Sequence, residues 1–279
     1  MTKQKSREHT RSASQHHAVL AIGAHPDDIE FLMAGTLILL KNAGWDLHYM
    51  NIANGNCGTE TEESERIIAV RRQEALDACK LIGARHYESI TNDLEIYHTT
   101  EVVAKVVAVV RQARPRILLL MSPTDYMEDH MNACRVGVTA AFARGMRNAP
   151  CGPPVPPISD EVTLYHAQPI ALRDPLRRSV PAGQYVDISS VMKMKREMLA
   201  AHRSQKEWLD ASQGLDSYLD TMEMLSREVG RMSGVFEYAE GWRRHSHLGF
   251  SAADQDPLSE VLGDRCIVDQ EYERSLDGS

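Results

Sequence analysis

A short segment near the start of the chain carries residue types suited to metal chemistry. Residues 24–30 read Ala-His-Pro-Asp-Asp-Ile-Glu and follow the apolar run AVLAIG at residues 18–23. Such a run is typical of a buried strand in a parallel sheet, and ligand sites in open α/β sheets form at the carboxyl ends of these strands. Imidazole and carboxylate groups together favour a borderline-soft divalent metal, for which zinc is the default expectation. His25, Asp27 and Asp28 are therefore candidates for a metal site.

A second polar cluster, TDYMEDH at residues 124–130, follows the apolar run at residues 116–123. A Rossmann-like strand order places the fourth strand beside the first, so Asp129 and His130 would converge with the segment around His25. Two histidines and a carboxylate are the protein ligands of several hydrolytic zinc sites. Zinc lowers the pKa of its bound water to about 7, and a carboxylate that is not a ligand can take the proton.

Both clusters also have a purely structural interpretation. Pro26 and Asp27 are ordinary residues for the first turn of a helix, and His130 alone could be a surface histidine at a helix start. Arg71 could simply be a solvated charge on a helix. His202 lies in a basic helix and could likewise have no role in substrate binding. We favour the functional interpretation of the two clusters because both are predicted to meet at one edge of the sheet.

Hydrophobic periodicity predicts the elements that position these residues. We expect an α/β, Rossmann-like three-layer domain with a mainly parallel sheet and a C-terminal elaboration. No G-x-G-x-x-G follows the first strand, so no dinucleotide is inferred. Strands are expected at residues 18–24, 46–53, 85–89, 116–123, 162–167 and 185–188, and helices at 29–43, 63–82, 102–113, 130–147, 190–209 and 218–232, with a proline-rich loop at 148–160.

Composition narrows the possible partners and the compartment. The chain has 279 residues and a formal net charge of −8, which disfavours nucleic acid as a partner. No apolar stretch approaches the ~20 residues of a membrane span. Five cysteines, an odd number with no C-x-x-C, suit the cytoplasm. We expect a disordered lead-in at residues 1–16, a catalytic domain at 17–250, and an extension at 251–279 that packs on the domain or on a neighbouring subunit.

The ordered motifs resemble those of the PIG-L/LmbE-like family of zinc-dependent N-deacetylases. Residues 24–30 match the family's A-H-P-D-D-x-E motif in full, and Asp129-His130 match the D-H that ends its second motif. Residues 71–75 resemble its R-x-x-E helix. Lys195 with residues 202–205 resembles its K-x-x-x-x-x-x-H-x-S-Q segment, and residues 236–240 resemble its late Y-A-E strand.

The resemblance implies roles for individual residues. One Zn²⁺ per chain would be held by His25, Asp28 and His130, with Asp27 as the general base. Asp129 would orient a neighbouring group, and Arg71 and His202 would lie near the substrate, as implied by their motifs. The implied substrate is an N-acylated, chiefly N-acetylated, amino sugar or glycoside, and the implied assembly is a homo-oligomer.

The chain departs from the family at Met127, where the second motif commonly has a histidine that helps to stabilise the oxyanion. A thioether cannot donate a hydrogen bond. Either Tyr126, His166 or a backbone N–H replaces that donor, or the reaction differs. The alternatives are a metal-dependent hydratase or lyase acting on a small unsaturated acid, and a non-catalytic sugar-binding protein. His245 and His247 are expected in a loop near the site mouth or in a subunit contact.

Overall fold

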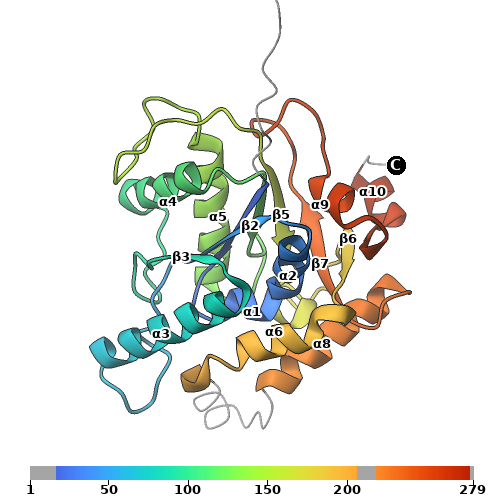
Figure 1. Cartoon of the computed structure of the whole chain (residues 1–279), viewed down its shortest axis with the longest axis horizontal. Coiled ribbons are helices and arrows are strands. Elements are labelled where there is room, and N and C mark those ends of the chain that lie inside the picture. The colour runs from blue at the N-terminus through green and yellow to red at the C-terminus, as the bar shows by residue number, and fades with distance from the viewer. Residues whose placement is uncertain (1–16, 206–217, 277–279) are drawn as a thin grey trace, which may run out of the picture.

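A single mixed sheet of eight strands forms the centre of the computed structural model, which describes residues 17–205 and 218–276 (Figure 1). The predicted lead-in at residues 1–16 lies outside the described residues. The strand order is β3-β2-β1-β4-β5-β7-β6-β8. The strands are β1 (Ala18–Gly23), β2 (Asp46–Asn51), β3 (Arg85–Tyr87), β4 (Ile117–Leu120), β5 (Thr163–Ala167), β6 (Gln184–Asp187), β7 (Ala239–Arg244) and β8 (Cys266–Val268). Neighbours from β3 to β5 pair in parallel, and the β5–β7, β7–β6 and β6–β8 pairs are antiparallel.

Helices cover both faces of this sheet and complete three layers. Helices α4 and α5 pack against each other, whereas α1, α2 and α3 each contact α6 in a second group, and the two groups lie on opposite sides of the sheet in Figure 1. The helices are α1 (Asp28–Leu32), α2 (Ala34–Asn42), α3 (Ser64–Ile82), α4 (Thr100–Ala113), α5 (Glu128–Ala143), α6 (Met192–Leu199), α8 (Tyr218–Ser233), α9 (Pro257–Leu262) and α10 (Gln270–Leu276). This confirms the predicted α/β three-layer fold.

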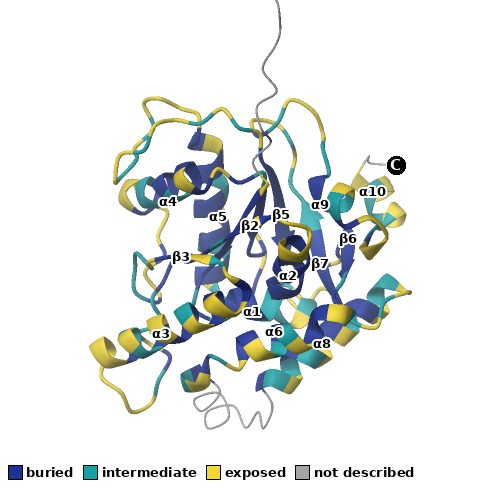
Figure 2. Cartoon of the chain, viewed as in Figure 1, coloured by how far each residue is buried: buried dark blue, intermediate teal, exposed yellow. Residues whose placement is uncertain are grey.

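The two apolar runs form adjacent strands in the interior of the sheet. Every residue of β1 and β4 is buried (Figure 2), as expected for parallel strands that are covered on both faces. They pair in parallel, with Val19 opposite Ile117 and Ile22 opposite Leu120. The chain leaves β1 toward β2 on one side, while β4 lies on the other. The loops after β1 and β4 therefore emerge next to each other at a topological switch point, where such folds bind ligands.

The helix predicted at residues 29–43 forms, but it is broken into α1 and α2 at Met33 (φ −133°). The break is stabilised by a carboxylate from a distant strand. Glu240 accepts hydrogen bonds from the backbone N–H groups of Gly35 and Thr36, both at 2.8 Å, and Lys195 Nζ lies 2.6 Å from the same carboxylate. Glu240 thus caps the N-terminus of α2. Glu240 of the late Y-A-E segment and Lys195 are therefore parts of a buried structural network.

The C-terminal part also departs from simple periodicity. The predicted helix at residues 190–209 is interrupted: α6 stops at Leu199 and residues 203–205 are helical again. Residues 206–209 lie outside the described residues. The extension at residues 251–279 adds β8 to the antiparallel edge beside β6, and α9 contacts α2. It packs on the domain, one of the two expected arrangements. Among the helices in the described ranges, none combines the length and apolarity needed to cross a bilayer.

Candidate metal centre

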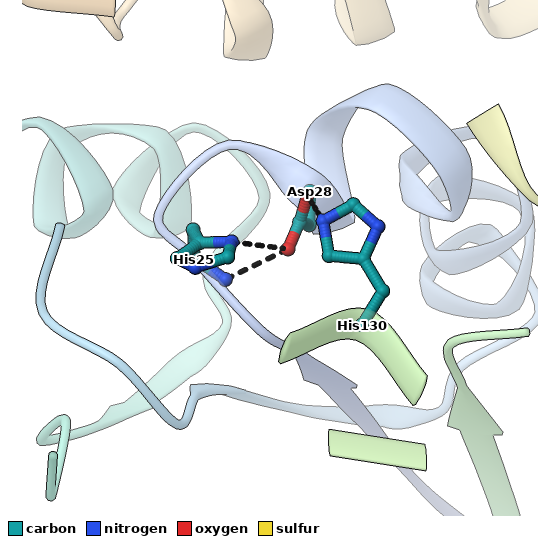
Figure 3. Close-up of side chains that lie close together, drawn as sticks. All are labelled: His25, Asp28 and His130. Atoms are coloured by element: carbon teal, nitrogen blue, oxygen red, sulfur yellow. Dashed lines mark hydrogen bonds and ion pairs between the residues drawn. The ribbon is translucent and has the colours of Figure 1, made fainter. Parts of the chain in front are cut away.

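Three side chains from the two predicted loops come together at the carboxyl ends of β1 and β4. His25 and Asp28 flank the start of α1, and His130 lies in the first turn of α5. One donor atom from each lies within 4.8 Å of the others. Figure 3 shows the carboxylate of Asp28 between the two imidazoles, with its Oδ2 3.6 Å from His25 Nδ1 and its Oδ1 3.3 Å from His130 Nε2. Backbone N–H groups of Ala24 and His25 donate to Asp28 Oδ2 at 3.0 and 2.7 Å and fix its position.

Each of these histidines has a second carboxylate on the far side of its ring. His25 Nε2 lies 3.0 Å from Asp129 Oδ2, which also accepts from the backbone N–H of Leu94 at 2.6 Å. His130 Nδ1 lies 3.1 Å from Asp125 Oδ1. A carboxylate behind each imidazole is the usual arrangement for histidines that bind a metal, because it fixes the tautomer and the ring orientation.

The carboxylates dominate the proton affinity of both rings. Burial alone would lower the pKa of His25, but Asp129 and Asp28 overcome it and raise that pKa to about 9. For His130, burial is likewise outweighed by Asp28 and Asp125, which raise its pKa to about 10. Burial opposes ionisation of Asp28 too, yet the two histidines hold the pKa of this carboxyl well below its usual range. The cluster therefore keeps Asp28 ionised.

Asp27 stands apart from this group and faces the same cavity. Its backbone adopts a left-handed conformation, with φ 113°, which is strained for a residue with a side chain. Its carboxylate lies 3.4 Å from Arg71 Nη2 and accepts a hydrogen bond from the Tyr218 hydroxyl. Burial raises the pKa of Asp27, and Arg71 partly offsets that effect. Arg71 and Tyr218 thus fix the position of the Asp27 carboxylate, which lies beside the cluster and is not part of it.

A cavity of about 340 Å³ opens onto the cluster and onto Asp27. Tyr126 and Met127 line it on the side of the second loop. Tyr126 is 57% exposed, and its ring meets the ring of His130 edge-on at 5.8 Å between centroids. Burial and the nearby carboxylates raise the pKa of the Tyr126 hydroxyl, so it remains a proton donor at neutral pH. Cavities of this size suit small molecules.

Arg71 joins the first loop to the rest of the cavity wall. Its guanidinium donates to the carbonyl oxygens of Pro26 and Gly55, in addition to its contact with Asp27. Gly55 has φ +81°, and a Cβ atom there would lie 2.5 Å from the Arg71 side chain, so a residue without a side chain is needed. Arg71 lines the cavity as well, although it is almost fully buried.

The remaining motif segments meet around the same wall. Glu74, one turn after Arg71 in α3, accepts hydrogen bonds from the backbone N–H and the hydroxyl of Ser204 at 2.9 and 2.7 Å. Gln205 Nε2 donates to the carbonyl of Gly58 at 2.9 Å. The R-x-x-E and H-x-S-Q segments therefore brace each other and the loop that contains Gly58.

Two of the predicted substrate-binding residues do not line this cavity. His166 borders a different cavity, where its Nε2 lies 2.9 Å from His245 Nδ1. His202 is fully buried, with Nε2 3.4 Å from Glu30 Oε2. His166 is therefore not placed to replace the donor missing at Met127, and His202 has no exposed surface to offer a substrate.

The structure adds two residues to which sequence reasoning gave no role. Asp125 supports His130 and is fully buried, and its only sequence signal is its position in the loop after the second apolar run. Tyr218 contacts Asp27 across 191 residues of sequence, so no local pattern could have placed it here. The fold brings both side chains to the cluster.

The donor set fits a divalent zinc-type ion. Two imidazoles and one carboxylate, with donor atoms close enough to share one ion, are the protein ligands of open hydrolytic zinc sites. The carboxylates behind both rings, Asp129 and Asp125, are the supports that such ligands need. The cavity beside the cluster leaves room for a water molecule and a substrate.

Comparison with known proteins points to one family. The family model described as PIG-L, GlcNAc-PI de-N-acetylase, matches residues 20–142. A diacetylchitobiose deacetylase from Thermococcus kodakarensis is 30% identical over 240 residues, which cover 81% of this chain and 82% of that protein.

Solved structures that share the fold include two with different activities. The N,N'-diacetylchitobiose deacetylase from Pyrococcus horikoshii superposes with a TM-score of 0.69 at 22% identity, over 87% of this chain and 88% of that one. The 4-carboxy-2-hydroxymuconate hydratase from Pseudomonas putida also gives 0.69, at 18% identity over 86% and 98%. The fold alone therefore does not choose between a deacetylase and a hydratase. The sequence relationship to the Thermococcus enzyme does assign the family: this chain belongs to the PIG-L, or LmbE-like, deacetylases.

Proposed function

We propose that this protein is a zinc-dependent amide hydrolase that removes an N-acetyl group from an amino sugar or glycoside. The observation that carries the proposal is the arrangement of two kinds of carboxylate around one cavity. Asp28 lies with His25 and His130 in a metal-type cluster, whereas Asp27 faces the same cavity from outside the cluster. A hydrolytic site needs both kinds, since one helps to hold the ion and the other moves a proton.

His25, Asp28 and His130 would hold the ion. When bound, zinc would act as a Lewis acid and lower the pKa of a coordinated water to about 7. Asp129 and Asp125 keep the two imidazoles oriented toward Asp28. The same two carboxylates increase the basicity of the rings and so favour metal binding.

Asp27 would transfer the proton in both halves of the reaction. It accepts a proton from the water that attacks the acetyl carbonyl carbon, and it then delivers that proton to the amine nitrogen as the C–N bond breaks. Acetate and the free amino sugar leave. Arg71 and Tyr218 hold the carboxylate in place for this task, and Arg71 limits the rise in its pKa that burial causes.

Tyr126 would supply the hydrogen bond that Met127 cannot. Its side chain lines the cavity next to His130, and its hydroxyl is a donor where the thioether of Met127 is not. A donor directed at the developing oxyanion accelerates acyl transfer, and loss of one such donor costs about 10²–10³ in rate. Arg71 also lines the cavity and, as its motif implies, would lie near the sugar.

The test is acetate release from N,N'-diacetylchitobiose, the substrate named for the Thermococcus relative, by wild type and by Asp27→Asn. We expect the variant to keep its metal and to lose turnover. Asp77→Asn, the same change at an exposed position of α3, is the matched control and should remain active. Turnover by Asp27→Asn at the wild-type rate would contradict the assignment of the base.

The same preparation tests the hydratase alternative, which the replacement at Met127 keeps open. Loss of the absorbance of a small unsaturated dicarboxylic acid, without acetate release from any N-acetylated sugar, would assign the site to hydration. Full metal loading with neither activity would instead favour a sugar-binding protein.

A further inference from the structure

A second cavity, of about 720 Å³, lies beside α5 and is larger than the one at the metal centre. It is lined by Cys134 and Arg135, one helical turn after His130, and by His166 from β5. Arg243, from β7, and Tyr272, from the C-terminal extension, also line it. Its volume is in the range of small-molecule sites, and nothing in the proposed reaction uses it.

Arg243 brings an unneutralised positive charge to this cavity. It is half-buried, and its Nη2 donates to Ser122 Oγ at 2.8 Å. Among the described residues, its Nε has no hydrogen-bond partner and no carboxylate lies within 4.0 Å of its guanidinium. A guanidinium stays protonated in proteins, and removing it from water is costly unless an anion pairs with it. The site therefore lacks a counter-ion.

The rest of the described lining is also free of acidic side chains. Arg135 is exposed on α5 and forms no ion pair within the part of the chain that the structure describes. Arg244 differs, because Asp254 and Glu273 lie 3.2 and 3.9 Å from its guanidinium. Two guanidinium groups, those of Arg135 and Arg243, thus remain available to a ligand.

The other reactive groups of the cavity do not suggest chemistry. Burial raises the pKa of the Cys134 thiol to about 12, so it is not a nucleophile at neutral pH. Burial and the neighbouring His245 lower the pKa of His166 to about 3, which leaves its ring neutral. In the described ranges, no carboxylate joins His166 and His245 to form a metal-type cluster. Binding, rather than catalysis, is the function that these groups support.

We propose that this cavity binds the phosphate or carboxylate group of a small organic anion, at Arg135 and Arg243 and separately from the metal centre. A guanidinium presents parallel N–H donors that match the oxygens of either group. The hydroxyl of Thr139 and the neutral imidazoles of His166 and His245 line the same cavity and are further hydrogen-bonding groups.

Isothermal titration of the full-length protein with inorganic phosphate tests this proposal. We expect saturable binding of one phosphate per chain that weakens at least about tenfold in Arg135→Gln and in Arg243→Gln, because each loses a charge-assisted hydrogen bond. Arg231→Gln removes the same charge from an arginine side chain on α8 that is 72% exposed, and it should bind as wild type does. A parallel titration with citrate distinguishes the two kinds of ligand. Tighter binding of citrate would indicate a preference for carboxylate groups, and tighter binding of phosphate a preference for phosphate groups.

Three results would overturn the proposal. The first is the absence of saturable binding of either anion. The second is an equal loss of phosphate affinity in Arg231→Gln, which would show that the effect comes from the net charge of the protein. The third is loss of binding in His130→Ala with no change in Arg135→Gln, which would place the anion at the metal centre. Since Arg135 is exposed, its substitution keeps the test valid even if Arg243→Gln does not fold.

Discussion

Two histidine pairs in this protein have nearly the same geometry and opposite electrostatics. The rings of His25 and His130 lie 5.6 Å apart at 53°, and those of His166 and His245 lie 5.1 Å apart at 55°. Carboxylates surround the first pair and raise its pKa values to about 9 and about 10. Burial, with no carboxylate to oppose it, lowers the pKa values of the second pair. The neighbours of a histidine pair, and not its spacing, therefore decide whether it suits a metal.

Replacing the tyrosine that lines the first cavity has the largest expected effect on the reaction rate. Tyr126→Phe should lower kcat for acetate release by about 10²–10³, with little change in KM, because a donor to the oxyanion is lost. Tyr272→Phe makes the same change in the wall of the second cavity and should stay within about twofold of wild type. Equal rates for the two variants would remove Tyr126 from the reaction.

The carboxylates behind the first histidine pair should tune metal affinity. We expect Asp129→Asn and Asp125→Asn each to weaken zinc binding by about 10–100-fold, as measured by competition with a chelator, because the imidazoles lose their support. Asp254→Asn, beside Arg244 near the second cavity, is the control and should leave affinity unchanged. Unaltered affinity in both test variants would mean that the carboxylates do not support metal ligands.

The two pairs should respond to pH in opposite directions. The folded pKa of His166, about 3, lies below its ordinary 6.5, so its contribution to stability is present above pH 6.5 and is lost as the pH falls toward 3. His166→Asn should therefore cost less stability at pH 5 than at pH 8, by up to about 2 kcal/mol. Urea unfolding at the two pH values measures the difference.

His130 provides the opposite case in metal-free protein. Its folded pKa of about 10 lies above 6.5, so its stabilising contribution is complete below pH 6.5 and is lost as the pH rises through 10. His130→Asn should cost more stability at pH 6 than at pH 10. If the loss of stability changed with pH in the same direction in His130→Asn and in His166→Asn, the contrast between the two pairs would be refuted.

The fold was predictable where local pattern decides it. The apolar runs predicted β1 and β4 as buried strands, and their position side by side followed from the Rossmann-like α/β alternation. The break in the predicted helix at residues 29–43 could not be foreseen, because Glu240, which caps α2, comes from β7 and no local pattern connects it with Met33. The strand β8 was missed for a related reason, since three residues at a sheet edge carry little periodicity.

The site was predictable where its residues directly follow β1 and β4, the two strands that lie side by side. His25, Asp28 and His130 come together as the strand order implies, and Asp27 faces the cavity beside them. His166 is predicted as a possible replacement for the donor missing at Met127, but it lines the other cavity. Tyr218 could not be found, because only the packing of α8 brings its hydroxyl to Asp27.

Metal content is the most direct test of the contrast between the two histidine pairs. Elemental analysis of protein purified without chelator should give about one zinc per chain for wild type and for His166→Ala, and none for His130→Ala. Absence of metal from wild type, or equal metal in the two variants, would contradict the assignment of the metal centre to His25, Asp28 and His130.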